Sequence, residues 1–328
     1  MPPWTQIDAA GPRVPDRGEA STLDSALLER IGVETVGLIV AQGSPLIDGQ
    51  AMDALPALRF VGDVDGDRFA DRVDVEAAWA RGITTLDTTN GTSYPVAEWA
   101  LAHMLIALRG AGGYFRQIID HSQGPVTRRP DDELIGGRGL TGKSVGLIGC
   151  GHIGRRLLEF LQAFRCSVSV YDPYLPRELP EILGITRTSL ENVLSSNDVV
   201  VCLAPLTPST KGMLGAEQFE LLPPGCVFVN VSRGAICDSD ALVARLERGD
   251  IVAGLDVYDP EPFPKDSPIV DLPNVFLSPH IAHIDDGYPE MFKIMVDEAE
   301  RILGGDEPYF ELSPRSLANR RGTDASKL

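Results

Sequence analysis

The segment Ser278–Asp285, with the sequence SPHIAHID, carries two of the five histidines of this 328-residue chain, His280 and His283. An imidazole titrates near neutral pH, so it can bind a metal ion, fill a core, or act as a general acid/base. A metal pair is the least favoured of the three, because the histidines follow an apolar run and Pro279, and no cysteine or further histidine stands nearby. The segment is therefore a candidate acid/base site.

A second chemical signature is the stretch VGLIGCGHIGRRL, in which Gly149, Gly151 and Gly154 form the pattern GxGxxG. It follows an apolar run and opens a helical pattern, where glycines allow a tight turn and let a pyrophosphate approach the first N–H groups of a helix. The pattern alone is weak evidence, since glycine-rich turns also occur for conformational reasons. Asp172, at the end of the next apolar run, has the position of an acid that binds ribose hydroxyls and repels a 2'-phosphate. Together these residues predict NAD as the cofactor rather than NADP.

A parallel sheet is needed to hold these residues. From Lys143 onward, helix-length segments separate six short β-branched runs: SVGLIG, SVSVYD, DVVVCLA, CVFVNV, IVAGLDV and NVFLSP. This alternation predicts an α/β fold with a doubly wound parallel sheet. Upstream, TVGLIVA and LRFVGDV are predicted strands and VEAAWARG a helix, while VAEWALAHMLIALRG and YPEMFKIMVDEAERILGG are predicted long helices that end at Gly110 and Gly304.

The order of these elements predicts two Rossmann-like domains with a ligand cleft between them. We expect residues 109–286 to form the NAD-binding domain, and residues 1–108 plus 287–328 to form a discontinuous substrate domain, bridged by the two long helices. The Pro-rich start and the polar tail RSLANRRGTDASKL are both expected to be mobile.

Composition excludes several kinds of partner. Asp and Glu total 47 against 29 Lys and Arg, so the formal charge of −18 disfavours nucleic acid and anionic membranes. No segment approaches ~18 consecutive apolar residues, and the start has no apolar signal-peptide core. The five cysteines are odd in number and lack CxxC spacing, which predicts reduced thiols. We expect a cytoplasmic homodimer that acts on a small molecule.

Three later stretches, VNVSRGAICDSDALVARLERGDIVAGLDVYDPEP, LPNVFLSPHIA and CLAPLTPSTKGMLG, together with GxGxxG, resemble the D-isomer-specific 2-hydroxyacid dehydrogenases. The resemblance covers nearly the whole predicted nucleotide domain and extends more loosely over the first domain. It implies interconversion of a D-2-hydroxy acid and its 2-oxo acid. In that reaction Arg233 would hold the substrate carboxylate and carbonyl oxygen, His280 would be the general acid/base, and Glu261 its acid partner.

The chemistry of these three residues agrees with the roles that the resemblance implies. Hydride addition to a 2-oxo carbon makes an alkoxide, which needs a proton from a group that titrates near neutral pH, such as His280. A carboxylate such as Glu261 fixes the imidazole tautomer and favours its charged form, whereas a glutamine there would suggest formate oxidation. Arg233 can grip a carboxylate through two parallel hydrogen bonds.

The resemblance also implies further cofactor contacts. Asp256 matches the residue that meets the nicotinamide carboxamide. The other matched positions are His152, Ile153, Pro205, Thr207, Val231, Ser232 and His283. His283 stands where relatives usually have a small residue or Trp, so it either lines the pocket or perturbs the titration of His280.

The Gly62–Asp74 segment departs from the family pattern. Relatives commonly carry a GxGxDNID-type loop whose N–H groups bind the substrate carboxylate, whereas this chain has the longer sequence GDVDGDRFADRVD. Counting forward from the preceding strand places Asp65–Asp67 at the substrate, and counting back from Asp74 places Asp67–Phe69 there. The candidate substrate residues are Gly66, Asp67, Arg68 and Phe69.

The charges of this loop admit two interpretations. Arg68 or Arg72 can engage a second anionic group of the substrate, or pair with neighbouring aspartates, which we favour. A calcium loop is disfavoured because Arg68 occupies the position that requires glycine, and no metal is expected.

Two other functions fit the same residues. One is oxidation of a phosphorus oxyanion such as phosphite by the same three residues, and the other is a non-enzymatic NAD(H)-sensing protein akin to corepressors of this fold. The sequence leaves the 2-hydroxy acid and the physiological direction open.

Overall fold

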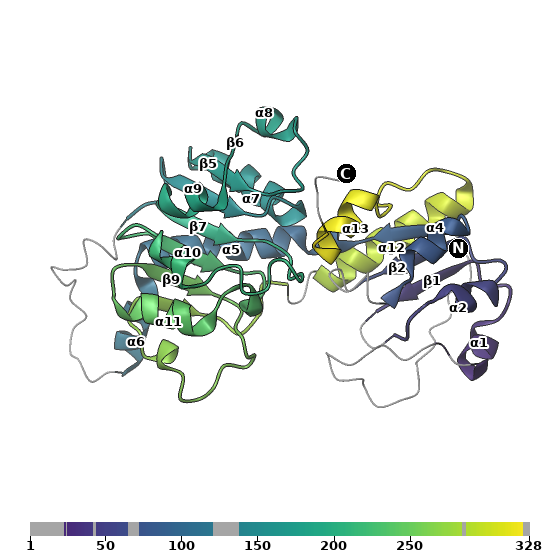
Figure 1. Ribbon diagram of the computed structural model, residues 1–328, viewed down its shortest axis with the longest axis horizontal. Coiled ribbons are helices and arrows are strands. Elements are labelled where there is room, and N and C mark those ends of the chain that lie inside the picture. The colour runs from purple at the N-terminus through teal and green to yellow at the C-terminus, as the bar shows by residue number, and fades with distance from the viewer. Residues whose placement is uncertain are drawn as a thin grey trace. The chain divides into compact units, whose positions relative to one another are not determined.

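The computed structural model describes residues 23, 25–41, 44–64, 72–120, 138–283 and 287–323. These residues divide into two compact units (Figure 1). The first is built from the described residues up to Thr92 and from 287 to Arg321, and the second from residues 93–283 with 322–323. The predicted α/β class with parallel sheets is confirmed in both units.

The second unit contains a seven-stranded parallel sheet with the order β10-β9-β8-β7-β4-β5-β6. All six predicted strands are present. The strands are β4 Ser144–Ile148, β5 Ser167–Tyr171, β6 Thr186–Arg187, β7 Val199–Cys202, β8 Val227–Asn230, β9 Val252–Leu255 and β10 Val275–Leu277. The edge strand β6 was not predicted, because two residues are too few to show a period.

Helices cover both faces of this sheet, as expected for strands that are apolar on both sides. Their bounds are α5 Ser93–Leu108, α6 Ala111–Asp120, α7 His152–Ala163, α8 Leu179–Leu183, α9 Leu190–Ser195, α10 Ala216–Glu220 and α11 Ser239–Glu247, with short 3₁₀ turns η3 Gly234–Ile236 and η4 Pro268–Val270. One core contains side chains of α5 and α7, and the other those of α9, α10 and α11.

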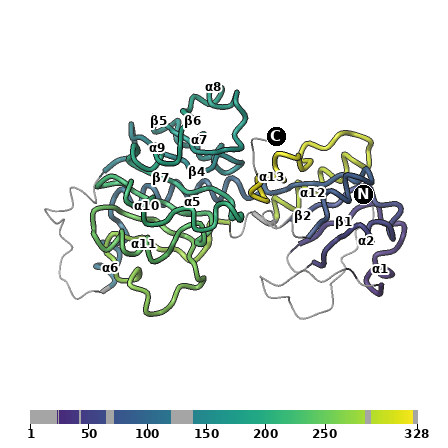
Figure 2. The backbone as a smooth tube through the Cα atoms, in the orientation of Figure 1, coloured from purple at the N-terminus to yellow at the C-terminus, as the bar shows by residue number. Residues whose placement is uncertain are grey.

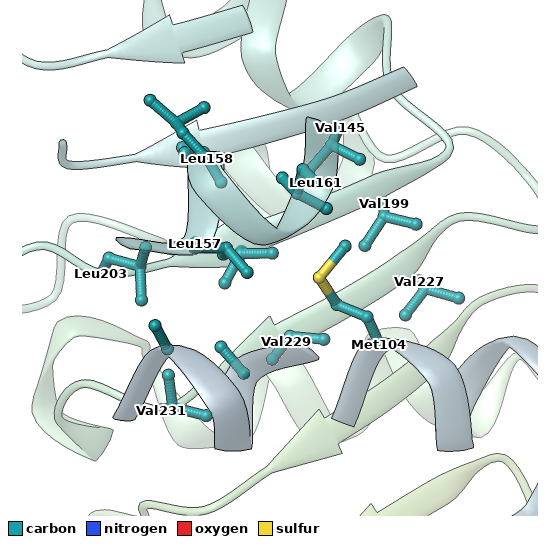
Figure 3. Close-up of a cluster of buried hydrophobic side chains, with 14 of the residues drawn as sticks. Met104, Val145, Leu157, Leu158, Leu161, Val199, Leu203, Val227, Val229 and Val231 are labelled. Atoms are coloured by element: carbon teal, nitrogen blue, oxygen red, sulfur yellow. The ribbon is translucent and has the colours of Figure 1, made fainter. Parts of the chain in front are cut away.

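Helix α5 belongs to the second unit, whereas the predicted boundary at residue 109 placed it in the first. Its side chain Met104 lies fully buried among valines of β4, β7 and β8 and leucines of α7 (Figure 3). Ala97 and Ala100 on the same helix are also buried in this core. The sequence predicts the helix correctly, but only the packing shows which sheet its apolar face covers.

The first unit contains a parallel sheet in the order β1-β2-β3, formed by Gly37–Val40, Phe60–Asp63 and Thr84–Asp87. Its helices are α1 Ser25–Ile31, α2 Gly49–Asp53, α4 Val75–Ala80, α12 Gly287–Gly304 and α13 Pro314–Arg321, with the 3₁₀ turn η1 Thr89–Thr92. Met291 and Met295 of α12 pack with Phe60 and Leu86 in one core, so a C-terminal helix lies against N-terminal strands (Figure 2).

The expectation that the tail is mobile is wrong for its described residues 315–323, which the fold holds in place. Arg320 in α13 donates to Asp87 Oδ2 at 2.6 Å, and both side chains are largely buried. Arg321 donates to Glu76 Oε2 at 2.8 Å. These arginines look like a solvated polar tail in the sequence because their partners lie more than two hundred residues away.

Within the described residues, no helix has both the length and the apolar character needed to cross a lipid bilayer.

Candidate active site

The predicted site residues follow one row of residues across the large sheet. Strand register aligns Tyr171, Ile148, Cys202, Asn230, Leu255 and Leu277 on neighbouring strands. Because all the strands are parallel, the residues that come next in the chain emerge at the same carboxyl edge. The predicted site residues within three positions after the row are Gly149, Gly151, Asp172, Pro205, Val231, Ser232, Arg233, Asp256 and His280. The chain order of the strands reverses between β4 and β7, the place where open α/β sheets bind ligands.

The three glycines of the glycine-rich loop have different surroundings. Gly149 has φ +96°, and a Cβ there would lie 2.9 Å from the backbone nitrogen of Ala204, so only glycine fits. A Cβ at Gly154 would lie 3.1 Å from the carbonyl oxygen of Gly149, which lets α7 begin close to the loop. A Cβ at Gly151 would meet no protein atom within 4 Å. The loop is therefore tight where it meets the sheet and open at Gly151.

Helix α7 begins at His152 and Ile153, and no side chain caps its N-terminus at Gly151. The N–H groups of a first helical turn attract negative charge, especially where no carboxylate or hydroxyl side chain caps them. This arrangement fits the pyrophosphate of a dinucleotide.

The carboxylate of Asp172 is fixed beside the glycine-rich loop. Its Oδ2 accepts from Cys150 N at 2.8 Å, and its Oδ1 accepts from Tyr174 N at 2.8 Å. The half-buried carboxylate lies directly after β5, where the ribose of a dinucleotide would be met. A fixed negative charge at this place disfavours a 2'-phosphate.

The loops after β7 and β8 are tied together. The hydroxyl of Ser232 donates to the carbonyl oxygen of Ala204, and Ser232 N donates to Asn230 Oδ1 at 3.0 Å. Pro205 and Thr207 follow in the loop after β7, and Val231 lies in the loop after β8. Thr207 and Val231 are buried, so their side chains support the loops. The predicted cofactor contacts of these four residues stay predictions.

His280 and Glu261 lie within hydrogen-bond distance of each other, as the family resemblance implies. His280 Nδ1 lies 3.0 Å from Glu261 Oε2. The carboxylate only accepts, so Nδ1 carries a proton and Nε2 is the ring nitrogen left for proton exchange with a substrate. Both side chains keep about a third of their surface exposed, at 29% and 33%, so a small molecule can reach them.

Arg233 lies in the loop after β8, directly before the 3₁₀ turn η3. Its Nη1 donates to the carbonyl oxygen of Ser232 at 2.8 Å, and its own carbonyl oxygen accepts from Asn230 Nδ2 at 3.1 Å. A Cβ on Gly234 would lie 1.9 Å from the carbonyl carbon of Tyr258, so the chain after Arg233 packs directly on the backbone after β9. Arg233 as a whole is half-buried.

The backbone around His280 is held by Asp256. His280 has φ +55°, in the left-handed region that non-glycine residues seldom adopt. Its N–H donates to the carbonyl oxygen of Asp256 at 2.8 Å, and Ile281 N and Ala282 N donate to the Asp256 carboxylate, each at 3.0 Å. Asp256 is fully buried. Its predicted contact with the nicotinamide carboxamide stays a prediction, and Oδ2 is the oxygen with acceptor capacity left.

Sequence reasoning did not select Trp99, His103 or Ser278, although all three are hydrogen-bonded to Asp256 or to each other. Trp99 and His103 lie in α5, whose mostly apolar sequence is typical of a helix that packs in a core. Their partners are more than 150 residues away, so no local pattern points to them.

The ring of His283 packs edge-on against His280, with centroids 5.5 Å apart and an interplanar angle of 72°. The rings of the two histidines are thus direct neighbours. This contact agrees with both interpretations of His283, as a pocket residue or as a group that affects His280.

Of the predicted substrate loop, Gly66, Asp67, Arg68 and Phe69 lie outside the described residues. Arg72 is described, and its buried Nη1 lies 3.6 Å from Asp63 Oδ1. This contact supports the interpretation in which that arginine pairs with a neighbouring aspartate. In the part of the chain that the structure describes, no group of three or more His, Cys, Asp or Glu side chains could hold a metal ion.

The buried cysteines are not candidate nucleophiles. All five are unpaired thiols. Burial raises the pKa of Cys150 to about 11 and the pKa of Cys202 and Cys226 each to about 12. A thiol with such a pKa is protonated at neutral pH and unreactive.

Comparison with known proteins agrees with this geometry. Residues 101–282 match the family model described as the NAD-binding domain of the D-isomer-specific 2-hydroxyacid dehydrogenases. D-3-phosphoglycerate dehydrogenase of Archaeoglobus fulgidus is 33% identical over 245 residues, which are 74% of this chain and 45% of that protein. Glyoxylate reductase of Korarchaeum cryptofilum is 31% identical over 273 residues, which are 81% of this chain and 78% of that protein.

Among solved structures, a phosphoglycerate oxidoreductase from Rhizobium etli superposes with a TM-score of 0.76 at 27% identity, over 88% of each chain. The chain spans about half the length of the D-3-phosphoglycerate dehydrogenases it matches. The protein belongs to the D-isomer-specific 2-hydroxyacid dehydrogenase family, and its second unit contains the family's NAD-binding domain.

Proposed function

We propose that this protein is an NAD-dependent oxidoreductase that interconverts a D-2-hydroxy acid and its 2-oxo acid. The observation that carries the proposal is the 3.0 Å contact between His280 Nδ1 and Glu261 Oε2, at the same sheet edge as the glycine-rich loop. A glutamate-bound imidazole is an acid/base, and the loop is a dinucleotide site.

In the direction of reduction, the Gly149–Gly154 loop would hold NADH, which when bound would supply a hydride to the carbonyl carbon of the substrate. Arg233 holds the substrate carboxylate and polarises the carbonyl oxygen with charge-assisted hydrogen bonds. The proton on Nε2 of the His280 imidazolium passes to the oxygen that becomes the hydroxyl. In oxidation, neutral His280 takes that proton back.

Glu261 has two tasks in this scheme. Its carboxylate accepts the Nδ1 proton and so fixes the ring with Nε2 towards the substrate. It also stabilises the positive charge that the ring carries before it gives up its proton. The acid at this position favours hydroxy-acid chemistry, which moves a proton to or from oxygen.

The substrate is defined only as a class. The relatives are named for phosphoglycerate and for glyoxylate, which differ in size and charge. We propose a small 2-oxo acid, because the buried contact of Arg72 with Asp63 leaves that arginine engaged within its own unit.

The proposal is tested by incubating the purified protein with NADH and a panel of 2-oxo acids that includes glyoxylate, hydroxypyruvate, phosphohydroxypyruvate and bulkier acids. We expect NADH oxidation with at least one of them. A parallel reaction with NAD and phosphite tests the phosphorus oxyanion alternative. NADH binding without turnover of any panel member would reject the enzyme and favour the sensing protein.

We also propose that the protein acts as a homodimer in the cytoplasm. Helix α6 exposes Phe115, Ile118 and Ile119 on one face, at 58%, 54% and 73%. Arg116 fixes the helix by donating to the carbonyl oxygens of Val270 and Val275. A fixed apolar face is typical of an interface, and the unpaired cysteines favour a reducing compartment. Light scattering at the mass of a single chain would contradict the dimer.

A further inference from the structure

We propose that Ser278 and His103 are positioning residues for the acid/base, because together with Asp256 they form a buried hydrogen-bond chain that holds the loop of His280. The inference rests on the role of His280 proposed above. Ser278 and Asp256 flank the ends of β10 and β9, and His103 lies in α5. All are in the second unit and are buried, Ser278 with 5% of its surface exposed and His103 with none.

The loop of His280 needs an external restraint. Its φ of +55° is unfavourable for a residue with a Cβ, so the backbone relaxes unless neighbouring groups hold it. Asp256 supplies that restraint, through its carbonyl oxygen to the N–H of His280 and through its carboxylate to the N–H groups of Ile281 and Ala282. The position of His280 therefore depends on the position of the Asp256 side chain.

Asp256 is in turn held from its other side. The hydroxyl of Ser278 donates to Asp256 Oδ1 at 2.5 Å, and Trp99 Nε1 lies 3.2 Å from both Asp256 Oδ1 and Ser278 Oγ. A fully buried carboxylate needs such donors, since it has lost its water. Ser278 orients Oδ1 and keeps the carboxylate aligned with the His280 loop.

The number of protons available in this hydrogen-bond chain determines the tautomer of His103. Ser278 has a single hydroxyl proton, which it gives to Asp256, so its oxygen must accept from His103 Nε2 at 2.9 Å. His103 therefore carries its proton on Nε2. Burial lowers its pKa to about 4, so the ring stays neutral at physiological pH. The chain runs in one direction, from His103 through Ser278 to Asp256.

The ring of His103 is fixed by its surroundings. It packs edge-on against Trp99, with centroids 5.3 Å apart, and against Phe276, with centroids 5.0 Å apart. A Cβ on Gly254 of β9 would lie 2.8 Å from His103 Nδ1, so the glycine makes room for the ring. The fold thus accommodates a polar ring where an aliphatic side chain would fill the same space.

Two matched pairs of variants test the proposal. Ser278→Ala removes the central hydroxyl and Ser278→Thr keeps it, while His103→Leu removes the donor and His103→Gln keeps an N–H at the place of Nε2. For Ser278→Ala and His103→Leu we expect kcat to fall about ten- to a hundredfold through misplacement of His280. KM for the 2-oxo acid and the Kd for NADH should stay within about threefold, and the Thr and Gln variants should recover most of kcat.

A second measurement does not depend on any substrate. Nitrogen-15 NMR of the histidine rings, with His280 assigned from its absence in His280→Ala, reports whether Nδ1 of His280 keeps the proton that it donates to Glu261. We expect this signal to broaden or shift in Ser278→Ala and His103→Leu but not in Ser278→Thr and His103→Gln. A wild-type protein that is inactive on every 2-oxo acid would reject the proposed function. The NMR comparison would still show whether Ser278 and His103 position His280.

Two outcomes would overturn the inference. One is an unchanged His280 signal together with a kcat within threefold of wild type in Ser278→Ala and in His103→Leu, when both are folded. The other is a loss of kcat in Ser278→Thr and His103→Gln that equals the loss in Ser278→Ala and His103→Leu. Such a result would show that the site tolerates no change of side-chain shape. If Ser278→Ala does not fold, as judged by circular dichroism, the pair at His103 decides between these results.

Discussion

The two halves of the candidate site lie at one edge of the same sheet but are made of different groups. The cofactor half, from β4 into α7, presents backbone N–H groups and depends on three glycines. The acid/base half, after β8, β9 and β10, presents the side chains of Arg233, Glu261 and His280. In the cofactor half the glycines allow the tight turn without strain, whereas in the acid/base half His280 itself adopts an unfavourable backbone conformation.

This difference shows how each half is specified. The cofactor half is encoded within six residues, because a turn and a helix start need only local geometry. The acid/base half needs Glu261 nineteen residues before His280, and it also needs Asp256, Ser278 and the remote His103. Changes in the first half should therefore alter cofactor affinity and stability, and changes in the second should alter turnover.

The largest expected effect is a loss of turnover without a loss of NADH affinity, which would separate the acid/base half from the cofactor half. His280→Ala should lower turnover by roughly 10²- to 10⁴-fold, the usual contribution of a positioned acid/base. The Kd for NADH should stay within about twofold, as measured by fluorescence titration. His283→Ala removes the neighbouring ring, a predicted cofactor contact, and leaves the contact between His280 and Glu261 in place, so it measures separately what that ring contributes to turnover and to NADH binding. A loss of less than tenfold in His280→Ala would mean that another group donates the proton.

Within the cofactor half, Gly149→Ala should destabilise the fold by about 1–3 kcal/mol, because the new Cβ meets the backbone of Ala204 at a positive φ. Gly151→Ala should leave stability almost unchanged and weaken NADH binding about tenfold, since that position is open and faces the expected pyrophosphate. Urea unfolding and NADH titration measure the two effects. If Gly151→Ala binds NADH with the wild-type affinity, the pyrophosphate does not bind at this loop.

The buried His103 should make stability depend on pH. Its pKa in the folded protein is about 4, whereas the unfolded chain has the ordinary value of 6.5. Below pH 6.5 the unfolded state binds a proton that the folded state does not, so stability is full above pH 6.5 and falls as the pH drops towards 4. Between pH 7.5 and 5 the wild type should lose ~2 kcal/mol more than His103→Gln. Equal losses in urea titrations at the two pH values would contradict the burial of a neutral ring.

The smallest expected effect concerns cofactor choice. Asp172→Ala should lower the preference for NADH over NADPH about tenfold, because it removes a charged acceptor for ribose hydroxyls and a repulsion against the 2'-phosphate. The ratio of kcat/KM for the two cofactors measures the change. Asp172→Asn keeps the size of the side chain and tests the charge alone. An unchanged ratio in both variants would place the ribose elsewhere.

The elements most visible in the sequence are those with long, strongly periodic or strongly apolar segments. The six central strands of the large sheet, α5, α7 and α12 are of this kind. Strand β6 and helix α13 were not recognised, because the first has two residues and the second is polar and stabilised by Arg320 and Arg321 through distant partners. Helix α5 was predicted but placed in the other domain, since periodicity shows an apolar face and not what it packs against.

The sequence by itself determined the family and the parallel α/β class, and it selected the glycine-rich loop, Asp172, Arg233, Glu261 and His280 as candidate site residues, because each of these stands in a short motif. Only the tertiary structure decided that His280 meets Glu261 at 3.0 Å and that Arg320 holds Asp87. It alone also showed that a buried chain from His103 through Ser278 supports Asp256. The physical reason is that hydrogen bonds between residues far apart in the chain exist only after packing brings them together, and they leave no periodic trace in the sequence.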